Sequence, residues 1–439
     1  MSMDIAVFGT GYLGVTHAAC MAELGHEVIG VDVDPAKIAQ LQKGEAPLYE
    51  PGLADLLRKH TASGRLRFTC SYELAARADV HFIAVGTPQR ADSAAADLTQ
   101  VNAVIETLGP LLTRPAVVLG KSTVPVGTAV QVAARLRELA PSADIGFGWN
   151  PEFLREGTAV EDTLRPDRIV LGAAAADRSR VKSVAREVYA QSLADGTPLV
   201  TTDLATAELT KVAANSFLAT KISFINSVAE VCDAVDADVT VLADAIGYDN
   251  RIGRRFLNAG LGFGGACLPK DVRAFRARAE ELGATAAADL LSGVDEINAR
   301  QRTRVATMAL DACSGIDSPR AAVLGLTFKP DSDDVRDSPA LDVAARLADA
   351  GVEVQAWDPH GMDNAEKRHP ELRYCDSPLA ACKGADVVLV MTEWAEIRDL
   401  TPEQLSEPVQ QRVLIDARNC LDPDVWRDAG WTYRGIGRR

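Results

Sequence analysis

The sequence predicts an α/β protein in which two Rossmann-like doubly wound domains are joined by a helical central domain. Three observations support this prediction. Short apolar, β-rich runs alternate with longer amphipathic stretches in the first half of the chain, which is typical of a parallel sheet covered on both faces. The alternation stops after residue 203 and resumes near residue 317. With 439 residues, the chain is also too long for one ordinary hydrophobic core.

The N-terminal domain, residues 1–203, is expected to hold an open parallel sheet. Residues 12–25 are predicted to form a helix directly after the first strand, and similar amphipathic stretches separate the later strands. The strand candidates are residues 4–11, 27–32, 80–88, 116–124, 144–150, 168–173 and 198–203.

Residues 204–316 are expected to form the helical central domain. Helical periodicity runs from Leu204 to about Ile246 with no strand candidate, and it returns after a glycine-rich loop. Because a long helix with an apolar face needs a surface that covers it, this domain is predicted to form a homodimer interface.

The C-terminal domain, residues 317–439, is expected to be a second and shorter α/β unit, with a hinge at residues 317–319. Strand–helix alternation starts again there after the long helical stretch. The strand candidates are residues 319–328, 352–359, 385–392 and 412–419.

Composition argues against several classes of protein. A formal charge of −15 is unfavourable for general nucleic-acid binding, which needs a basic surface. No segment has the length and apolar character of a membrane span, and the opening residues do not resemble a secretory signal. The eight cysteines are scattered without a C-x-x-C pair, so we expect free thiols in a reducing cytoplasm and no metal site.

The first turn carries the pattern G-x-G-x-x-G, formed by Gly9, Gly11 and Gly14. Alone the pattern is a weak signal, but here it follows a predicted strand, opens a predicted helix, and precedes Asp32 at the next strand end. That context is typical of a dinucleotide site, where the pyrophosphate rests on the helix N-terminus. Asp32 is expected to bind the adenosine ribose and to repel a 2′-phosphate, which favours NAD over NADP. The alternative is a glycine turn that only packs the helix on the strand.

Further cofactor contacts are expected near this turn and at later strand ends. Lys37 lies one helical turn beyond the second strand, where it is able to assist at the ribose. Thr87 and Thr123 follow later strands, at the sheet edge where ligands bind in such folds. Ordinary strand-end turns capped by hydroxyls are the alternative for both threonines. Tyr12 and Leu13, between the glycines, complete the predicted nucleotide site.

The stretch GLGFGGACLPKD, residues 260–271, places Cys267 behind four glycines and ahead of Pro-Lys-Asp. Glycines let a substrate and the backbone approach closely, and Lys270 supplies a cation of the kind that lowers the pKa of a nearby thiol. The pattern therefore favours a reactive cysteine over a buried packing residue.

Two pairs of polar residues are candidates for the chemistry. Glu152 and Glu156 stand four residues apart after a strand end, and both a cleft position and a solvated surface pair are open to them. Lys211 and Asn215, also four residues apart, share one face of a helix. Together they are able to donate to a developing oxyanion, and a lysine that snorkels from an apolar helix is the alternative.

Six motifs resemble those of the UDP-glucose/GDP-mannose dehydrogenase family. They are GTGYLG, STVPVGT, NPEFLREG, ELTKVAANSF, GFGGACLPKD and GLTFKPDSDDVRDSP, in the family's order and across essentially the whole chain. The resemblance implies the three-part fold and an enzyme that oxidises the C6 alcohol of a nucleotide sugar to a carboxylate with two molecules of NAD. It also implies UDP-glucose as the substrate and UDP-glucuronate as the product.

The resemblance implies a catalytic role for several residues. The cysteine would form a thiohemiacetal and then a thioester, which water hydrolyses. The lysine and the asparagine of ELTKVAANSF match groups that stabilise the oxyanion, the lysine being also a candidate base. The aspartate of CLPKD matches a carboxylate that organises water with the help of a threonine and a glutamate. These implied catalytic residues are Cys267, Lys211, Asn215, Asp271, Thr123 and Glu152.

Cofactor and substrate contacts are implied in the same way. Glu156 and Lys270 resemble residues near the nicotinamide, and Arg336 resembles a cofactor contact made from the C-terminal domain. Arg251 resembles an arginine that reaches the substrate of the neighbouring subunit. The implied substrate contacts are Glu152, Phe153, Leu154, Lys211, Asn215, Arg251, Phe256, Gly264 and Lys329.

Other activities stay open beside this one. Ala266 and Leu268 replace the serine and phenylalanine that flank the cysteine in many family members, and CLPKDVRA resembles the GDP-mannose branch. Oxidation of GDP-mannose or another nucleotide sugar at C6 is therefore the alternative activity. An NAD-binding sensor or scaffold is the non-enzymatic alternative, and a dehydrogenase that performs one oxidation is a third. The number of NADH molecules formed per sugar separates these classes. It is two for a nucleotide-sugar 6-dehydrogenase, none for a sensor or scaffold, and one for a dehydrogenase that performs one oxidation.

Overall fold

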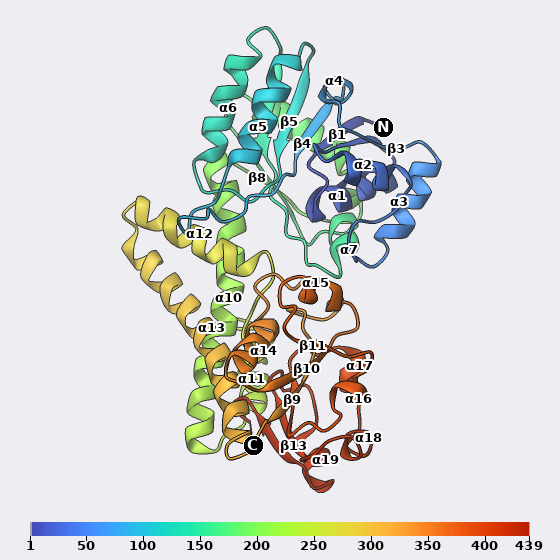
Figure 1. Cartoon of the computed structure of the whole chain (residues 1–439). Coiled ribbons are helices and arrows are strands. Elements are labelled where there is room, and N and C mark those ends of the chain that lie inside the picture. Colours follow the sequence, from blue (N-terminus) through green and yellow to red (C-terminus); the bar gives the residue numbers. More distant parts are fainter. Residues whose placement is uncertain (1, 439) are drawn as a thin grey trace. The chain divides into compact units, whose positions relative to one another are not determined.

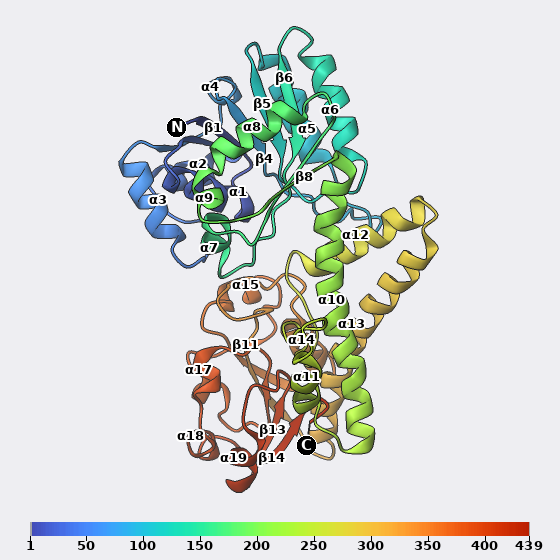
Figure 2. The same cartoon turned by 180° about the vertical axis from the view of Figure 1, so that it is seen from behind.

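The computed structural model of the protein describes residues 2–438. The chain divides into two compact units, Met1–Ala214 and Asn215–Arg439, and each contains one open sheet. The boundary falls inside helix α10, Leu204–Val235. Figure 1 and Figure 2 show the elements of each unit from opposite sides.

Residues 2–214 form eight strands with helices between them. The strands are β1 (Asp4–Phe8), β2 (Glu27–Val31), β3 (Leu66–Thr69), β4 (Val80–Ile83), β5 (Ala116–Gly120), β6 (Ile145–Trp149), β7 (Ile169–Ala173) and β8 (Leu199–Thr202). Besides the start of α10, the helices are α1 (Tyr12–Glu23), α2 (Pro35–Gln42), α3 (Leu53–Ala62), α4 (Tyr72–Ala75), α5 (Thr99–Leu108), α6 (Thr128–Leu139), α7 (Ala159–Leu164), α8 (Arg178–Val188) and α9 (Ala190–Ala194). Every strand candidate in this unit coincides with an observed strand.

The first sheet has the order β3-β2-β1-β4-β5-β6-β7-β8, which confirms the predicted doubly wound fold. Helices cover both faces of this sheet, so successive residues of β1 point into two different hydrophobic cores. Ile5 and Val7 belong to the core that contains buried α1 side chains, whereas Ala6 and Phe8 belong to the core that contains those of α5 and α6. Burial on both faces explains why the strand sequences are continuous apolar runs.

One strand pair departs from the predicted parallel sheet. β7 runs antiparallel to β6, while the other neighbouring pairs among residues 2–214 are parallel. The connection between them contains one short helix, α7, and β7 starts from the end of the sheet where β6 stops.

Residues 215–438 hold a second sheet, in the order β11-β10-β9-β12-β13-β14, and its neighbouring strands run parallel. Its strands are β9 (Arg320–Leu324), β10 (Glu353–Trp357), β11 (Arg373–Tyr374), β12 (Val387–Val390), β13 (Val413–Asp416) and β14 (Thr432–Gly435). The helices that cover this sheet are α14 (Pro339–Asp349), α15 (Met362–Glu366), α16 (Pro378–Ala381), α17 (Ala395–Arg398), α18 (Pro402–Ser406) and α19 (Pro423–Asp428).

The predicted helical stretch lies between the two sheets along the chain. After α10 it contains α11 (Val239–Gly247), α12 (Leu268–Glu281) and α13 (Thr285–Ala312), and no strand is found in residues 204–316. The glycine-rich loop with the candidate cysteine connects α11 to α12. In the part of the chain that the structure describes, no helix is long and apolar enough to cross a bilayer.

Candidate active site

The turn between β1 and α1 has the geometry that the glycine pattern predicts. Gly9 has a φ of 92°, and a Cβ there would lie 2.8 Å from the Cα of Val85. A Cβ on Gly14 would lie 1.8 Å from the carbonyl oxygen of Gly9. Gly11 precedes α1 without a side-chain cap, and a Cβ there would meet no atom within 4 Å. The N-terminus of α1 therefore has open space at Gly11 and no side-chain cap, as a pyrophosphate site requires.

Asp32 follows β2 and is held as an anion. Its Oδ2 accepts hydrogen bonds from the N–H and the hydroxyl of Thr10 at 2.9 and 2.7 Å, and Lys37 lies 3.0 Å away. Burial by itself raises the pKa of this carboxyl. The hydrogen bonds from Thr10, Lys37 and Asp34 outweigh burial and bring the pKa below its ordinary value. An ionised carboxylate here suits a ribose diol and disfavours a 2′-phosphate.

Glu50 ties the first turn of α1 to the loop that carries Glu156. The phenol of Tyr12 donates to Glu50, and the same carboxylate accepts from the N–H groups of Gly157 at 2.7 Å and Ala159 at 2.6 Å. Burial, and after it the bond to Glu50, raise the pKa of Tyr12, so the phenol stays protonated. The sequence offered no signal for Glu50, whose partners lie far away along the chain.

The two predicted threonines stand at neighbouring strand ends. Thr87, after β4, donates its hydroxyl to the carbonyl of Thr123, after β5, at 2.7 Å. Their turns are thereby joined at the carboxyl edge of the sheet. Leu13 is partly buried against the core beneath α1.

Lys211 and Glu152 form a buried ion pair in the first unit. Lys211 Nζ lies 2.8 Å from Glu152 Oε1, and the two side chains are 4% and 10% exposed. The N–H of Leu154 donates to Glu152 Oε2 at 2.5 Å, and Lys211 Nζ lies 5.7 Å from the ring centre of Phe153. Glu152 is not a solvated surface carboxylate, and Lys211 does not snorkel to water.

The predicted cysteine, amide and carboxylate of the second unit gather at the start of α12. Cys267 is the N-cap residue, and its side chain is exposed. Asp271, buried one turn later, accepts a hydrogen bond of 2.6 Å from Asn215 Nδ2 and pairs with Lys270 Nζ at 2.6 Å. The helix N-terminus attracts negative charge, including that of a thiolate. Lys270, expected as the cation of the thiol, has Asp271 as its carboxylate partner.

The glycines before Cys267 also serve the packing of their loop, and Gly260, Gly262 and Gly264 line the pocket described below. A Cβ on Gly262 would lie 2.4 Å from Asn298 Oδ1, and one on Gly264 would lie 2.4 Å from a backbone oxygen. Asn298 also accepts from the N–H of Phe263 at 2.7 Å and donates to its carbonyl at 3.0 Å. Side chains larger than hydrogen would push the loop away from these partners.

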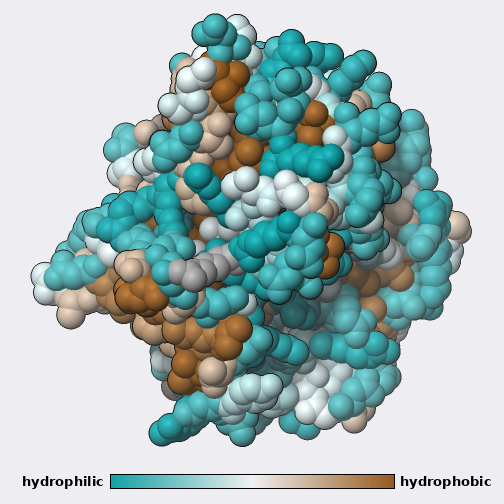
Figure 3. All heavy atoms as spheres, turned by 90° about the horizontal axis from the view of Figure 1, so that it is seen from below, coloured by the Kyte–Doolittle hydropathy of each residue, from teal (hydrophilic) through white to brown (hydrophobic). Residues whose placement is uncertain are grey.

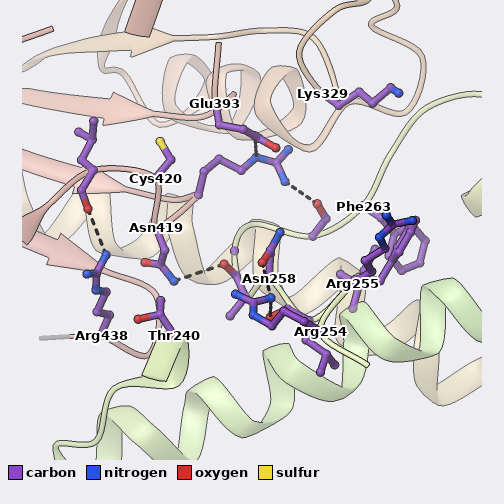
Figure 4. Close-up of a pocket in the computed structure, with 18 of the residues that line it drawn as sticks. Thr240, Arg254, Arg255, Asn258, Phe263, Lys329, Glu393, Asn419, Cys420 and Arg438 are labelled. Carbon is purple, nitrogen blue, oxygen red and sulfur yellow. Dashed lines mark hydrogen bonds and ion pairs between the residues drawn. The ribbon is translucent and has the colours of Figure 1, made fainter. Parts of the chain in front are cut away.

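A pocket of about 1110 Å³ lies beside this loop in the second unit (Figure 4). Of the predicted substrate contacts, Phe256, Gly264 and Lys329 line it, as does Leu268, the neighbour of Cys267. It also has many cationic and amide side chains, which suit a diphosphate. These are Arg254, Arg255, Asn258, Arg418, Asn419 and Arg438.

Two predicted arginines lie on the surface of the second unit. Arg251 pairs with Asp249 at 2.6 Å and Arg336 with Asp334 at 2.8 Å, and both guanidinium groups are exposed. Within residues 215–438, neither lines the pocket.

The sequence analysis missed two cations, the half-buried Arg418 and the buried Lys121. Arg418, in the turn after β13, donates to the carbonyls of Gly262 at 3.1 Å and Phe328 at 3.0 Å, and so braces the glycine loop. Lys121 follows β5 and lines a small cavity together with Glu152. Both stand directly after strands, so the strand-end argument used for the threonines would also have found them.

Three domain models of one family match the chain in order. The NAD-binding domain of the UDP-glucose/GDP-mannose dehydrogenase family matches residues 3–193, the central domain matches residues 205–300, and the UDP-binding domain matches residues 322–423.

Individual proteins are similar over the full length. A UDP-glucose 6-dehydrogenase of Rhizobium meliloti (strain 1021) is 43% identical over 437 residues, which cover 99% of this chain and 100% of that protein. A UDP-glucose 6-dehydrogenase of Bacillus subtilis (strain 168) is 40% identical over 439 residues, covering 99% and 93%. The solved structure of a UDP-glucose dehydrogenase from the archaeon Pyrobaculum islandicum matches with a TM-score of 0.91 at 37% identity, covering 100% and 98%.

Proposed function

Since this chain belongs to the UDP-glucose/GDP-mannose dehydrogenase family, we propose that it oxidises UDP-glucose at C6 to UDP-glucuronate and reduces two molecules of NAD per sugar. The observation that carries the proposal is the 43% identity over nearly the whole chain to a protein with that activity in its name. An exposed cysteine at a helix N-terminus supports it.

The first unit supplies the cofactor site. The chain has the family's NAD-binding domain, and the open N-terminus of α1 suits a pyrophosphate. Asp32 and Lys37 are assigned to the adenosine ribose. NAD, when bound, provides the acceptor for the hydride that leaves the substrate in each oxidation. Thr87, Glu156, Lys270 and Arg336 remain further candidates for cofactor contacts.

Cys267 is assigned as the nucleophile of the second oxidation. The first oxidation leaves an aldehyde, whose planar carbon is a poor hydride donor. Addition of the Cys267 thiolate forms a C–S bond and a tetrahedral thiohemiacetal, from which hydride departs more easily. The product is a thioester, and attack by water breaks the C–S bond, restores the thiol and releases the carboxylate.

Lys211 and Asn215 are assigned to the oxyanion that develops at C6. An amide nitrogen has two donor hydrogens. Asp271 accepts one hydrogen of Asn215 at 2.6 Å, which leaves the second to donate to the substrate. Glu152 keeps a counter-ion beside Lys211, and Thr123 is a candidate for positioning the hydrolytic water.

The pocket of the second unit is assigned to the nucleotide sugar. The diphosphate carries negative charge, and arginines and Lys329 line the pocket. Phenylalanine rings among the lining residues suit the flat faces of a base or a sugar. The family's UDP-binding domain, matched at residues 322–423, supports this assignment.

We further propose a homodimer built on α10. Phe217, Phe224 and Val231 are 65%, 52% and 61% exposed, and a spacing of seven residues puts them on one stripe of the helix. Figure 3 shows apolar side chains gathered on part of the surface. When a second subunit covers this stripe, the apolar area of the stripe is removed from water, which stabilises the dimer. The exposed Arg251 is then assigned to the substrate of the neighbouring subunit.

The domain boundaries and the location are also proposals. We propose that the chain works as three domains, residues 1–203, 204–316 and 317–439, because only the middle one is all-helical. No disulfide joins cysteines among the described residues, which fits a reducing cytoplasm.

The test is a comparison of substrates with purified protein and NAD. Among UDP- and GDP-sugars, we expect UDP-glucose to have the highest kcat/KM and to yield two NADH and UDP-glucuronate. A preference for GDP-mannose would favour the other branch of the family. NAD binding with no NADH from any sugar would favour a sensor or scaffold, and one NADH would favour a single oxidation.

A further inference from the structure

Lys121 is a lysine that the fold buries beside neutral partners. The residue follows β5 and is 6% exposed. Its Nζ donates to Asn150 Oδ1 at 3.2 Å and to the hydroxyl of Tyr189 at 3.4 Å. No carboxylate in residues 2–438 forms an ion pair with it. Burial lowers the pKa of Lys121 to about 8, so the amine still carries its charge at neutral pH.

The local structure does not require this charge. Tyr189 donates to Asn150 Oδ1 at 2.6 Å, and Asn150 Nδ2 donates to the carbonyl of Val170 at 2.8 Å. Both polar side chains therefore keep a partner without Lys121. A buried ammonium with only neutral partners costs stability, so its presence calls for a reason outside the packing.

Glu152 supplies that reason. Lys121 and Glu152 both line a small cavity of about 40 Å³. Such a space holds an ordered water when polar groups surround it. Lys121 and Glu152 attract each other electrostatically, and Lys121 and Lys211 repel. His17 also lines this cavity, and burial and Lys121 lower its pKa, so that it is neutral. The remaining titratable lining residues are Tyr189, Asp162, which pairs with Arg155, Asp167 and Arg168.

Glu152 is thus attracted by two ammonium groups, those of Lys211 and Lys121. Lys211 is its direct partner at 2.8 Å and is also the residue assigned to the developing oxyanion. When Lys211 donates to the substrate, its attraction for Glu152 is shared, and the buried carboxylate loses part of its stabilisation. Lys121 is held by Asn150 and Tyr189 and keeps its attraction for the carboxylate.

We propose that Lys121 is a positioning residue, whose buried ammonium stabilises the Glu152 carboxylate while Lys211 directs its own ammonium to the reacting oxygen. The proposal rests on the function proposed for Lys211. Its first part, the action of Lys121 on Glu152, is measurable without turnover.

A double-mutant cycle in thermal stability tests that first part with the full-length protein. Lys121→Met keeps a long side chain without charge, and Glu152→Gln removes the carboxylate charge. At pH 7 we expect Glu152→Gln to lower Tm at least twice as much in the wild type as in the Lys121→Met background. At pH 9.5 Lys121 is mostly neutral, and the two decreases should become similar. In a control cycle, Tyr189→Phe takes the place of Lys121→Met. Because Lys121 keeps its charge there, the effects of Tyr189→Phe and Glu152→Gln on Tm should be additive.

Steady-state kinetics test the second part. We expect Lys121→Met to lower kcat by about tenfold or more, with KM for UDP-glucose and NAD within about twofold. The kcat profile of the wild type should change near pH 8, and this change should be absent in Lys121→Met. Lys121→Arg keeps the charge and should retain more activity than Lys121→Met.

The outcomes separate this proposal from the proposed function. Equal Tm decreases in both backgrounds at pH 7, or an unchanged kcat profile in Lys121→Met, would overturn the role of Lys121. A wild type that forms no NADH from any sugar would overturn the proposed function, and the thermal cycle would still decide whether Lys121 acts on Glu152.

Discussion

Asn215 donates a hydrogen bond of 2.6 Å to Asp271, and the acceptor lies one turn after Cys267 in α12. The carboxylate is buried, and Lys270 pairs with its other oxygen. The bond sets the orientation of the amide, because one of its two N–H donors is committed to Asp271. Preorganised donors of this kind act most strongly when they are already aimed before the reaction starts.

Asp271→Asn should therefore impair the chemistry more than the binding. The substituted amide is neutral and offers a donor of its own to Asn215, so the orientation of Asn215 is lost. We expect kcat to fall by about 10²–10³ with little change in KM for UDP-glucose. Asp289→Asn, at an exposed position of α13, is the matched control and should be fully active. An equally active Asp271→Asn enzyme would remove Asn215 and Asp271 from the mechanism.

Cys267→Ser and Cys267→Ala should both stall, in different ways. A serine hydroxyl is scarcely ionised at neutral pH, and an ester hydrolyses more slowly than a thioester. Turnover by the serine variant should fall by several orders of magnitude, and a sugar adduct should accumulate that is visible in intact-protein mass spectra. The alanine variant should show no adduct. Cys70→Ser, at another exposed cysteine, serves as control. Near-normal NADH formation by Cys267→Ala would defeat covalent catalysis.

Asp32 should make the enzyme strongly selective for NAD. The ionised carboxylate repels a 2′-phosphate at short range, and we expect kcat/KM with NADP to be at least about 100-fold lower. Asp32→Asn should reduce the ratio of kcat/KM with NAD to kcat/KM with NADP, mainly by weakening the binding of NAD. Asp34→Asn changes a residue that caps α2 and should leave the ratio unchanged. Comparable efficiency of the wild type with both cofactors would show that Asp32 does not face the ribose.

Mixed dimers should test the proposed exchange of Arg251 between subunits. Arg251→Ala and Cys267→Ala should each be nearly inactive alone. A mixture that exchanges subunits should regain activity, because one site of each mixed dimer retains both residues. Phe224→Glu, in the exposed stripe of α10, should give monomers in light scattering. Absence of any recovery in verified mixed dimers would place Arg251 outside the partner's site.

Lys121 should make stability depend on pH with a defined sign. Its pKa is about 8 in the folded protein against an ordinary 10.5, a difference that corresponds to about 3 kcal/mol. Below pH 8 both the folded and the unfolded chain bind the proton, and this cost is fully present. Between pH 8 and 10.5 only the unfolded chain binds it, so the cost is relieved as pH rises. Urea unfolding should show Lys121→Met to be more stable than the wild type at pH 7, with a smaller difference at pH 10. A less stable variant at pH 7 would indicate that the ammonium supports the fold.

The sequence by itself determined the two sheets and the cofactor turn. β4 and β5 are buried along their whole length, so their apolar runs stand out without any knowledge of their neighbours. The turn at Gly9 needs a positive φ and a close approach, and glycine is the residue that permits both. Lys211 and Asn215 were singled out by local spacing, because spacing decides which residues share a helix face. Cys267 was singled out by the glycines before it and the Pro-Lys-Asp after it.

Only the tertiary structure decided which polar groups are buried and what they touch. β3 and β14 escaped prediction because they are sheet edges whose residues alternate between buried and exposed. Lys121 meets Tyr189 across 68 positions of sequence, and Arg418 meets Gly262 across 156. The glycines at 262 and 264 owe their need for a hydrogen side chain to residues that fold against them. Local sequence encodes dihedral preference and periodicity, whereas burial and charge pairing arise when distant segments meet.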